Sequence, residues 1–205
     1  MEPFFLEGRE IIFSLLHLEC RLLWDEALRK SYLDVLTEFS AEAGFEVYAF
    51  SVFSDRIYMI TGRFGVYTEE EAREVQFGAL RHFLKYGDLR DEDREVTAEG
   101  GTPWADCVKL KDLDDVLDTM VYIHLVAQDL GYIRTGIDYW WSSAQTYRKR
   151  YRWKVVRMDV ILAAISTDRE HARRIVVRRH RVTVWHENTV PVCIKNCVER
   201  NIRVS

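Results

Sequence analysis

The order of apolar and polar residues first predicts the strands of the chain. Apolar runs and period-two alternation predict strands at 11–18, 45–53 and 56–62. The last two are joined by the short polar step Ser54-Asp55, which is typical of a hairpin corner. A further apolar stretch at 104–110 is the candidate for a fourth strand. These four segments would form one antiparallel sheet.

Helices are predicted between these strands, where apolar positions recur three and four residues apart. The stripe over 25–44 ends on a glycine, which suits the left-handed residue that stops a helix. The stretch 69–86 opens with acids that complement the helix dipole, and the stripe over 112–131 is the strongest. Thr167 with Glu170 fits a capping box that would start a later, arginine-rich helix.

This order of strands and helices predicts a ferredoxin-like α+β fold, an antiparallel sheet with helices on one face. The chain has 205 residues, 48% of them hydrophobic, which is enough for one ordinary domain with an appendage. We assign residues 1–140 to the α+β domain. Residues 141–205 would be a basic helical extension packed on it.

Composition narrows the class of protein. No stretch approaches roughly 18 uncharged apolar residues, so we expect no membrane span. The first residues include acids and an arginine within their apolar runs, unlike a secretory signal. Four cysteines are too few for a disulfide framework, which makes a reducing, cytoplasmic setting the default. The chain also has no glycine-rich phosphate loop and no nucleophile elbow.

Charge is unevenly distributed along the chain. Residues 66–118 carry 7 bases and 15 acids, whereas residues 144–205 carry 15 bases and 5 acids. A basic final third on an acidic body predicts a surface that faces a polyanion. The alternative is that the basic segment docks on the protein's own acidic middle.

Two stretches of the sequence resemble a known family. YIHL at 122–125, GYI at 131–133 and DYWWSS at 138–143 follow one another. This run is similar to YIHLNPVRAGLV…DYPWSS of the REP-associated tyrosine transposases, a branch of the single-tyrosine, His-hydrophobic-His transposases. GFEVYAF and the following residues to 60 resemble the family's GVEVHAYCLMPNHVHLL, and ILAAISTDREHARR at 161–174 resembles its closing LALFGKDREEARR.

The resemblance, which covers about residues 9–181, implies DNA strand cleavage. In the family, two histidines hold a divalent metal that polarises a phosphodiester. A tyrosine then attacks phosphorus and keeps the DNA 5′ end as a phosphotyrosine. Two imidazoles one residue apart on a strand point to the same face and can share one metal ion.

The residues that carry this chemistry are replaced in this chain. The family's histidine pair falls on Arg56 and Tyr58, and the asparagine before it falls on Asp55. A guanidinium has no lone pair to give a metal, and a phenol is a poor ligand unless ionised. Counting back from Tyr122 places the nucleophile at Ala105, and the 35 residues before Tyr122 contain no tyrosine. The sequence therefore predicts a degenerate site, without metal, cofactor or catalytic residue.

The run YRKRYRW at 147–153 is the strongest nucleic-acid candidate, because arginine and lysine neutralise phosphates and aromatic rings stack on unpaired bases. Together with the later helix, the candidate binding residues are Tyr147, Arg148, Lys149, Arg150, Tyr151, Arg152, Arg173 and Arg174. In the alternative interpretation the rings are core anchors and the bases a solvated face, with the arginine-rich helix paired to the acidic loop at 88–99. We assign Trp141 to the core.

Four candidate zinc ligands lie within 18 residues: His180, His186, Cys193 and Cys197. Their Cys-x3-Cys spacing is one helical turn and not the tight knuckle of most structural zinc sites. A short helix over 189–200 is the simpler interpretation, and zinc binding stays open.

Three hypotheses of function remain. The first is a domesticated, catalytically inactive transposase-like protein that binds hairpin or single-stranded nucleic acid, DNA before RNA, through 144–181. The second is an enzyme with a rearranged site that makes a phosphotyrosine link through Tyr58 or another tyrosine. The third is an interaction module, either a homodimer or a binder of an acidic partner.

Overall fold

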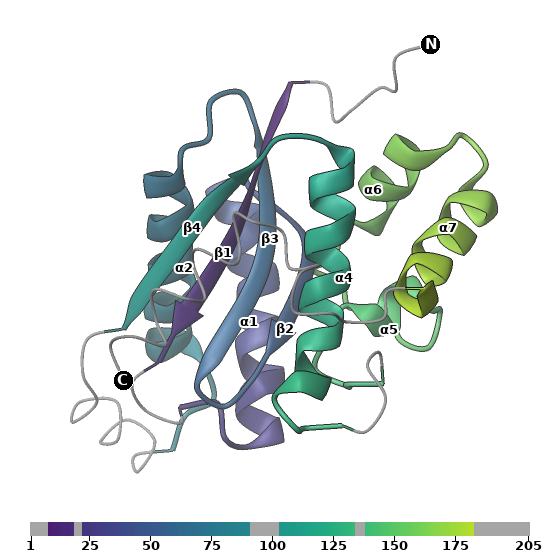
Figure 1. Cartoon of the computed structure of the whole chain (residues 1–205). Coiled ribbons are helices and arrows are strands. Elements are labelled where there is room, and N and C mark those ends of the chain that lie inside the picture. Colours follow the sequence, from purple (N-terminus) through teal and green to yellow (C-terminus); the bar gives the residue numbers. More distant parts are fainter. Residues whose placement is uncertain (1–7, 19–21, 91–102, 134–137, 183–205) are drawn as a thin grey trace.

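The computed structural model describes residues 8–18, 22–90, 103–133 and 138–182. Its centre is an antiparallel sheet of four strands, β1 (Arg9–His17), β2 (Glu46–Val52), β3 (Arg56–Phe64) and β4 (Trp104–Leu110). The strands lie in the order β2-β3-β1-β4, the order of a ferredoxin-like fold (Figure 1). The four strands predicted from hydrophobic alternation are confirmed. A tight corner joins β2 to β3, where the Phe53 amide donates to the Arg56 carbonyl at 2.9 Å.

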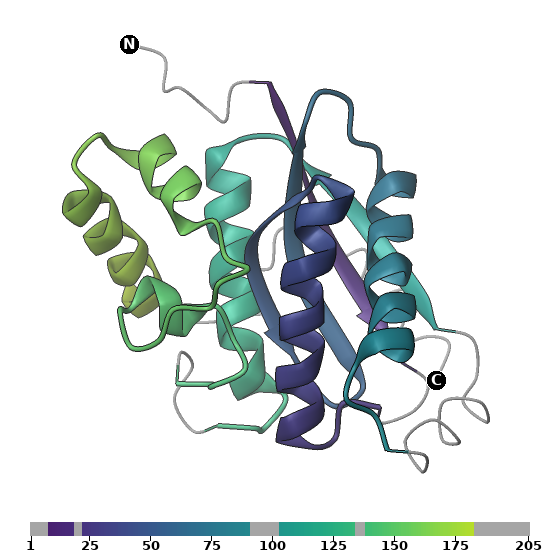
Figure 2. The same ribbon diagram turned by 180° about the vertical axis from the view of Figure 1, so that it is seen from behind.

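Helices α1 (Glu26–Ala43) and α2 (Glu69–Tyr86) cover one face of the sheet. Helix α4 (Leu113–Asp129) lies on the other face, against β2 and β3 (Figures 1 and 2). The three predicted helices are therefore confirmed, but one of them, α4, lies on the opposite face of the sheet, whereas the sequence predicted helices on one face. Gly44 ends α1 with φ +70°, as its left-handed stop requires, and no described helix is long and apolar enough to cross a membrane.

Three shorter helices follow: α5 (Ala144–Tyr147), α6 (Met158–Ile165) and α7 (Arg169–Val182). The prediction that Thr167 caps α7 is wrong by one residue. Asp168 is the cap, because its Oδ1 accepts from the amides of Glu170 at 2.9 Å and His171 at 3.0 Å. The charged oxygen of Asp168 thus accepts from two amides of the first turn, as an N-terminal cap does.

The chain after α4 bonds to the outer edge of β2. The Ser143 amide donates to the Phe50 carbonyl at 3.0 Å, and the Arg157 amide donates to the Val47 carbonyl at 2.8 Å. Strand β2 is therefore covered by α1 on one face, by α4 on the other and by residues 141–157 along its edge. The basic C-terminal helices are fixed to the sheet by main-chain bonds as well as by side-chain packing.

Side chains of α2 bond to the main chain of β4, the strand at the opposite edge. Arg73 Nε donates to the Ala105 carbonyl at 3.2 Å, and the Lys109 amide donates to Glu69 Oε1 at 3.1 Å. Both edge strands of the sheet thus bond to other parts of the described chain.

Candidate nucleic-acid interface

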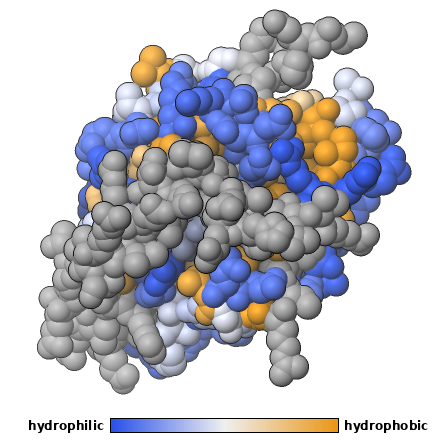
Figure 3. Space-filling model, viewed as in Figure 1, coloured by the Kyte–Doolittle hydropathy of each residue, from blue (hydrophilic) through white to orange (hydrophobic). Residues whose placement is uncertain are grey.

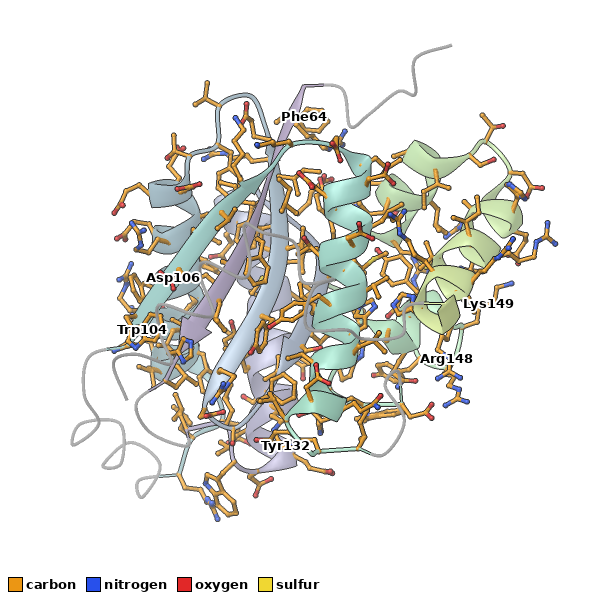
Figure 4. All side chains as sticks on the ribbon, viewed as in Figure 1. Phe64, Trp104, Asp106, Tyr132, Arg148 and Lys149 are labelled. Carbon is orange, nitrogen blue, oxygen red and sulfur yellow. The ribbon has the colours of Figure 1, made fainter. Side chains whose placement is uncertain are left out.

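The register of the sheet defines which residues share a face with the positions of the family's histidine pair. Arg56 is paired with His17, and His17 is paired on its other side with Trp104. The next row on the same face carries Tyr58 and Asp106, each paired with the same residue of β1. Figure 4 shows Trp104 and Asp106 on β4 at this side of the molecule.

Arg56 is held by the neighbouring carboxylate. Its Nη2 lies 2.7 Å from Asp55 Oδ2, and its Nε donates to Asp55 Oδ1 at 3.2 Å. Burial acts to raise the pKa of Asp55, but the hydrogen bond and charge of Arg56 outweigh it and hold that pKa below its usual value. The first of the two positions that the resemblance aligned with the histidine pair therefore carries an internal ion pair.

Tyr58 is packed into the aromatic core. It is 3% exposed, and its ring lies against Phe13, Phe53 and Tyr122, with centroids 5.8–6.4 Å apart. Burial raises the pKa of the Tyr58 hydroxyl, although the charge of Arg56 acts in the opposite direction. A neutral, buried phenol is a poor metal ligand and a poor nucleophile. Buried aromatic side chains therefore fill the face of the sheet around Tyr58.

His17 is the imidazole nearest in register to these two residues. Its ring stacks on Trp104 at 3.8 Å between centroids, and its buried Nε2 has no hydrogen-bond partner. Burial, and then the charge of Arg56, lower the pKa of His17 to about 4. One neutral imidazole beside a guanidinium does not make a divalent-cation site. Across the described residues, no group of three or more His, Cys, Asp or Glu side chains could hold a metal ion.

The structure gives no support for a nucleophile at position 105. Ala105 shares its face of β4 with Cys107, which packs with Tyr67 and Ala72 on the side of α2, away from Tyr58. The position reached by the ungapped count therefore lies on the opposite face of the sheet from Tyr58. Sequence reasoning missed Tyr122, whose ring on α4 lies beside Tyr58 at 6.0 Å between centroids. Its place in the YIHL motif was the available signal.

A cationic groove lies between α7 and the turn that follows α5. It consists of two adjoining cavities of about 710 and 470 Å³, which share Lys149 and Arg173 in their linings. The cations that line it are Arg148, Lys149, Arg150, Arg152, Arg169, Arg173, Arg174 and Arg178. Arg148 and Lys149 project at the α5 end of this groove in Figure 4, and Figure 3 shows hydrophilic surface where α7 lies. The six predicted cations thus come together in one place.

One carboxylate bridges two of these cations. Asp138 Oδ1 accepts from Nη1 of both Arg148 and Arg150, each at 2.6 Å. The Arg150 and Asp138 side chains are about half exposed, at 53% and 44%. An ion pair in contact with water is worth little net free energy, so a competing anion can replace the carboxylate.

A second carboxylate lies in the groove itself. Glu170 Oε1 accepts from Lys149 Nζ at 2.8 Å and from Arg173 Nη1 at 2.9 Å. The hydrogen bond from Lys149 lowers the pKa of Glu170, so this carboxylate stays ionised. Lys149 has φ +61°, the one non-glycine residue of the described chain in the left-handed region. The Lys149 side chain therefore extends from a turn whose backbone conformation is strained.

The two tyrosines of the basic run have different environments. Tyr147 is 1% exposed and its hydroxyl donates to the Tyr48 carbonyl at 2.9 Å, so the prediction that it stacks on a base is wrong. Tertiary burial, invisible in the local pattern, takes this ring into the core. Tyr151 is 42% exposed and lies against Trp140, whereas Trp141 is buried as its assignment to the core required.

Two buried histidines join α7 to α4. His180 Nδ1 donates to the Val176 carbonyl at 2.7 Å, which leaves its Nε2 to accept from His124 Nδ1 at 2.8 Å. His124 Nε2 then accepts from the Ser143 hydroxyl at 2.6 Å. Burial lowers the pKa of His180 to about 4 and that of His124 well below its usual value. Both rings are therefore neutral.

The hydrogen bonds of His180 also affect whether this residue could bind zinc. Both ring nitrogens of His180 are engaged in hydrogen bonds, so this residue has no lone pair for a metal. The other three candidate ligands, His186, Cys193 and Cys197, and the helix predicted over 189–200 lie outside the described residues.

Part of the basic helix does dock on acids of the same chain. Arg179 Nη1 lies 3.0 Å from Asp114 Oδ1, and its Nη2 lies 2.9 Å from Asp118 Oδ1 at the start of α4. The acids are therefore those of α4, whereas most of the loop at 88–99 lies outside the described residues. The cations of the groove lie on the other side of α7 from this contact or on the turn after α5.

The fold is similar to that of a solved structure. No family model and no curated protein matches the chain. The arrangement of the sheet and helices matches the structure of a REP-associated tyrosine transposase bound to a REP hairpin, with a TM-score of 0.51 and 13% identity. The match covers 75% of this chain and 88% of that one, and at this identity it establishes the fold.

Proposed function

We propose that this chain is a degenerate transposase-like protein that binds hairpin or single-stranded nucleic acid, with DNA as the favoured ligand, and does not cleave it. The cationic groove is the observation that carries the proposal. Among the residues that the structure describes, eight arginine and lysine side chains line it, and Glu170 is the one carboxylate in that lining. Repeated cations in one groove neutralise consecutive phosphates of a nucleic-acid backbone. The transposase of similar fold was solved with a hairpin bound, which supports the same class of ligand.

The loss of cleavage rests on a different part of the molecule. Arg56 and Tyr58 replace two imidazoles, and in the structure one is paired with Asp55 and the other buried. Neither can offer a lone pair to a divalent metal in that state. The chain would therefore bind nucleic acid without cleaving it, although its resemblance to the family implies DNA cleavage.

Fluorescence anisotropy with labelled hairpin DNA, single-stranded DNA and hairpin RNA, measured from about 50 to 200 mM salt, tests the proposal. The triple variant Arg148→Ser, Lys149→Ser, Arg150→Ser should reduce the slope of log K against log salt by about 2–3. Arg81→Ser with Lys85→Ser on α2, outside the groove, is the matched control and should leave the slope unchanged. Absence of salt-dependent binding to every probe would refute the proposal.

A second candidate function is favoured by the position of Tyr122. Its ring lies beside Tyr58, where the family's metal pair would be, so an enzyme with a rearranged site would use one of these two hydroxyls. Burial raises the pKa of both phenols, which argues against either as a nucleophile. Incubation with hairpin DNA and Mg²⁺ or Mn²⁺ should give no covalent adduct. An adduct that is lost in Tyr122→Phe or Tyr58→Phe would establish the enzyme instead.

A further inference from the structure

Two exposed aromatic rings continue the cationic groove at one end. Trp140 is 47% exposed and Tyr151 is 42% exposed, with ring centroids 5.2 Å apart and planes tilted by 50°. Tyr151 also lines the smaller cavity of the groove together with Lys149, Arg150 and Arg152. A surface of rings is thus contiguous with a surface of cations.

The rings are held in place from behind. Trp153 is 6% exposed and contacts both of them, with centroids 4.6 Å from Tyr151 and 6.4 Å from Trp140. Trp153 in turn packs on Trp141 and Phe50 of the core. Because their inner sides rest on buried rings, Trp140 and Tyr151 would lose little conformational entropy on contacting a ligand.

Trp140 is 47% exposed, whereas the neighbouring Trp141 is 6% exposed and supplies the buried ring of this segment. Large rings that remain half exposed mark a contact surface, and here that surface adjoins eight cations.

We infer that Trp140 and Tyr151 form a stacking site for an unpaired base whose flanking phosphates lie in the cationic groove. The inference rests on the proposed function and names the kind of nucleic acid that function would select. Every base presents a flat π face, so stacking requires unpaired nucleotides but no particular sequence. The complementary charge of the groove identifies the occupant as a polyanion and not as an apolar partner surface. The preferred ligand is then a hairpin with an unpaired tail.

Three hairpins that share one stem separate stacking from charge. One is blunt, one carries a four-nucleotide tail, and one carries an abasic tail with the same number of phosphates. The wild-type chain should bind the tail with bases about tenfold more tightly than the abasic tail. Trp140→Ala and Tyr151→Ala should each reduce that ratio severalfold. Trp140→Phe, which retains a ring, should keep most of it.

Tyr86→Ala is the matched control, because Tyr86 is 59% exposed on α2 outside the groove. Photocrosslinking of a tail containing 5-iodouracil to the wild-type chain should label Trp140 or Tyr151, a readout that needs no variant to fold.

The outcomes distinguish this inference from the proposed function. Equal affinity for the tails with and without bases, alongside salt-dependent binding of the blunt hairpin, would overturn the stacking site alone. A tail preference that survives both alanine variants, or a crosslink elsewhere, would do the same and would leave the rings as a surface for a protein partner. Failure of all three probes to bind would remove the proposed function as well.

Discussion

Two arginine–carboxylate pairs of this molecule lie in different surroundings. On the sheet, Arg56 is paired with Asp55 next to the buried ring of Tyr58, and the two side chains are 29% and 36% exposed. In the groove, Arg150 is paired with Asp138 at a surface where both side chains are about half exposed. The first pair borders a packed aromatic core, whereas the second lies in contact with water, where another anion can compete for the arginine.

The comparison predicts that substitutions in the two regions will change different quantities, stability in one and binding in the other. Around Tyr58, substitutions should change the free energy of unfolding, because packed rings are lost. Around Arg150, substitutions should change affinity and its salt dependence, because little packing depends on that side chain. The exposed cations of the groove are therefore available to a ligand, whereas the face around Tyr58 is part of the core.

The largest effect should come from removing the buried ring of Tyr58. Tyr58→Ala should lower the free energy of unfolding by about 3–5 kcal/mol, because a buried ring is replaced by a cavity. Tyr151→Ala, at a half-exposed ring, is the comparison and should cost much less. Urea unfolding followed by circular dichroism measures both. A Tyr58→Ala loss no larger than that of Tyr151→Ala would contradict the comparison.

The next effect is a dependence of stability on pH through the histidine pair. His180 has a folded pKa of about 4 against about 6.5 in the unfolded chain, so below pH 6.5 only the unfolded chain takes up the proton. Its contribution is complete above pH 6.5 and should fall by roughly 3 kcal/mol as the pH drops toward 4. His180→Gln should flatten this part of the stability profile.

His171→Gln, at an exposed position on the same helix, is the control for that measurement and should retain the wild-type pH profile. Urea titrations at several pH values between 7 and 4 supply the data. An identical slope in His180→Gln and the wild type would exclude the pair as its source.

A smaller effect is expected from removing the carboxylate that bridges Arg148 and Arg150. Asp138→Asn removes the charge shared by Arg148 and Arg150, so affinity for hairpin DNA should rise and the salt slope should steepen by about 1. Asp159→Asn removes a carboxylate paired with Arg157 outside the groove and should change neither quantity. Weaker binding of Asp138→Asn would show that the carboxylate positions the cations instead of competing with the ligand.

The smallest effect concerns the strained turn at Lys149. Lys149→Asn keeps a residue that tolerates φ +61° and should change stability by less than about 0.5 kcal/mol, while it lowers the salt slope by about 0.9. Lys149→Val should cost about 1–2 kcal/mol, because a β-branched residue clashes in this conformation. Thermal unfolding and anisotropy measured on the same samples separate the two effects.

Local patterns were sufficient for the strands and helices but not for their partners. The apolar run from Ile11 and the stripe after Asp25 depend on neighbouring residues, so periodicity located them. The face that Ala105 presents and the burial of Tyr147 depend on strand pairing across the sheet and on helix packing. No count along the chain contains that information, so the sequence could assign neither the face of Ala105 nor the burial of Tyr147.

The candidate interface likewise contains residues that the sequence pattern predicted and residues that it did not predict. Six of its cations were predicted because a basic run and a basic helix are visible in composition. Asp138 was not, because a single acid ten residues before Arg148 has no local signature as a bridge between two guanidiniums. The contact between His124 and His180 joins residues 56 positions apart and likewise required the fold.

The side chains that bond to β4 have a consequence for association between copies. An edge strand with unpaired amides and carbonyls is a template on which another chain can extend the sheet and nucleate aggregates. Arg73 and Glu69 occupy the Ala105 carbonyl and the Lys109 amide, and residues 141–157 occupy the outer edge of β2. A strand of a second molecule could not form the same main-chain bonds at these positions, which hinders growth of the sheet from one molecule into the next.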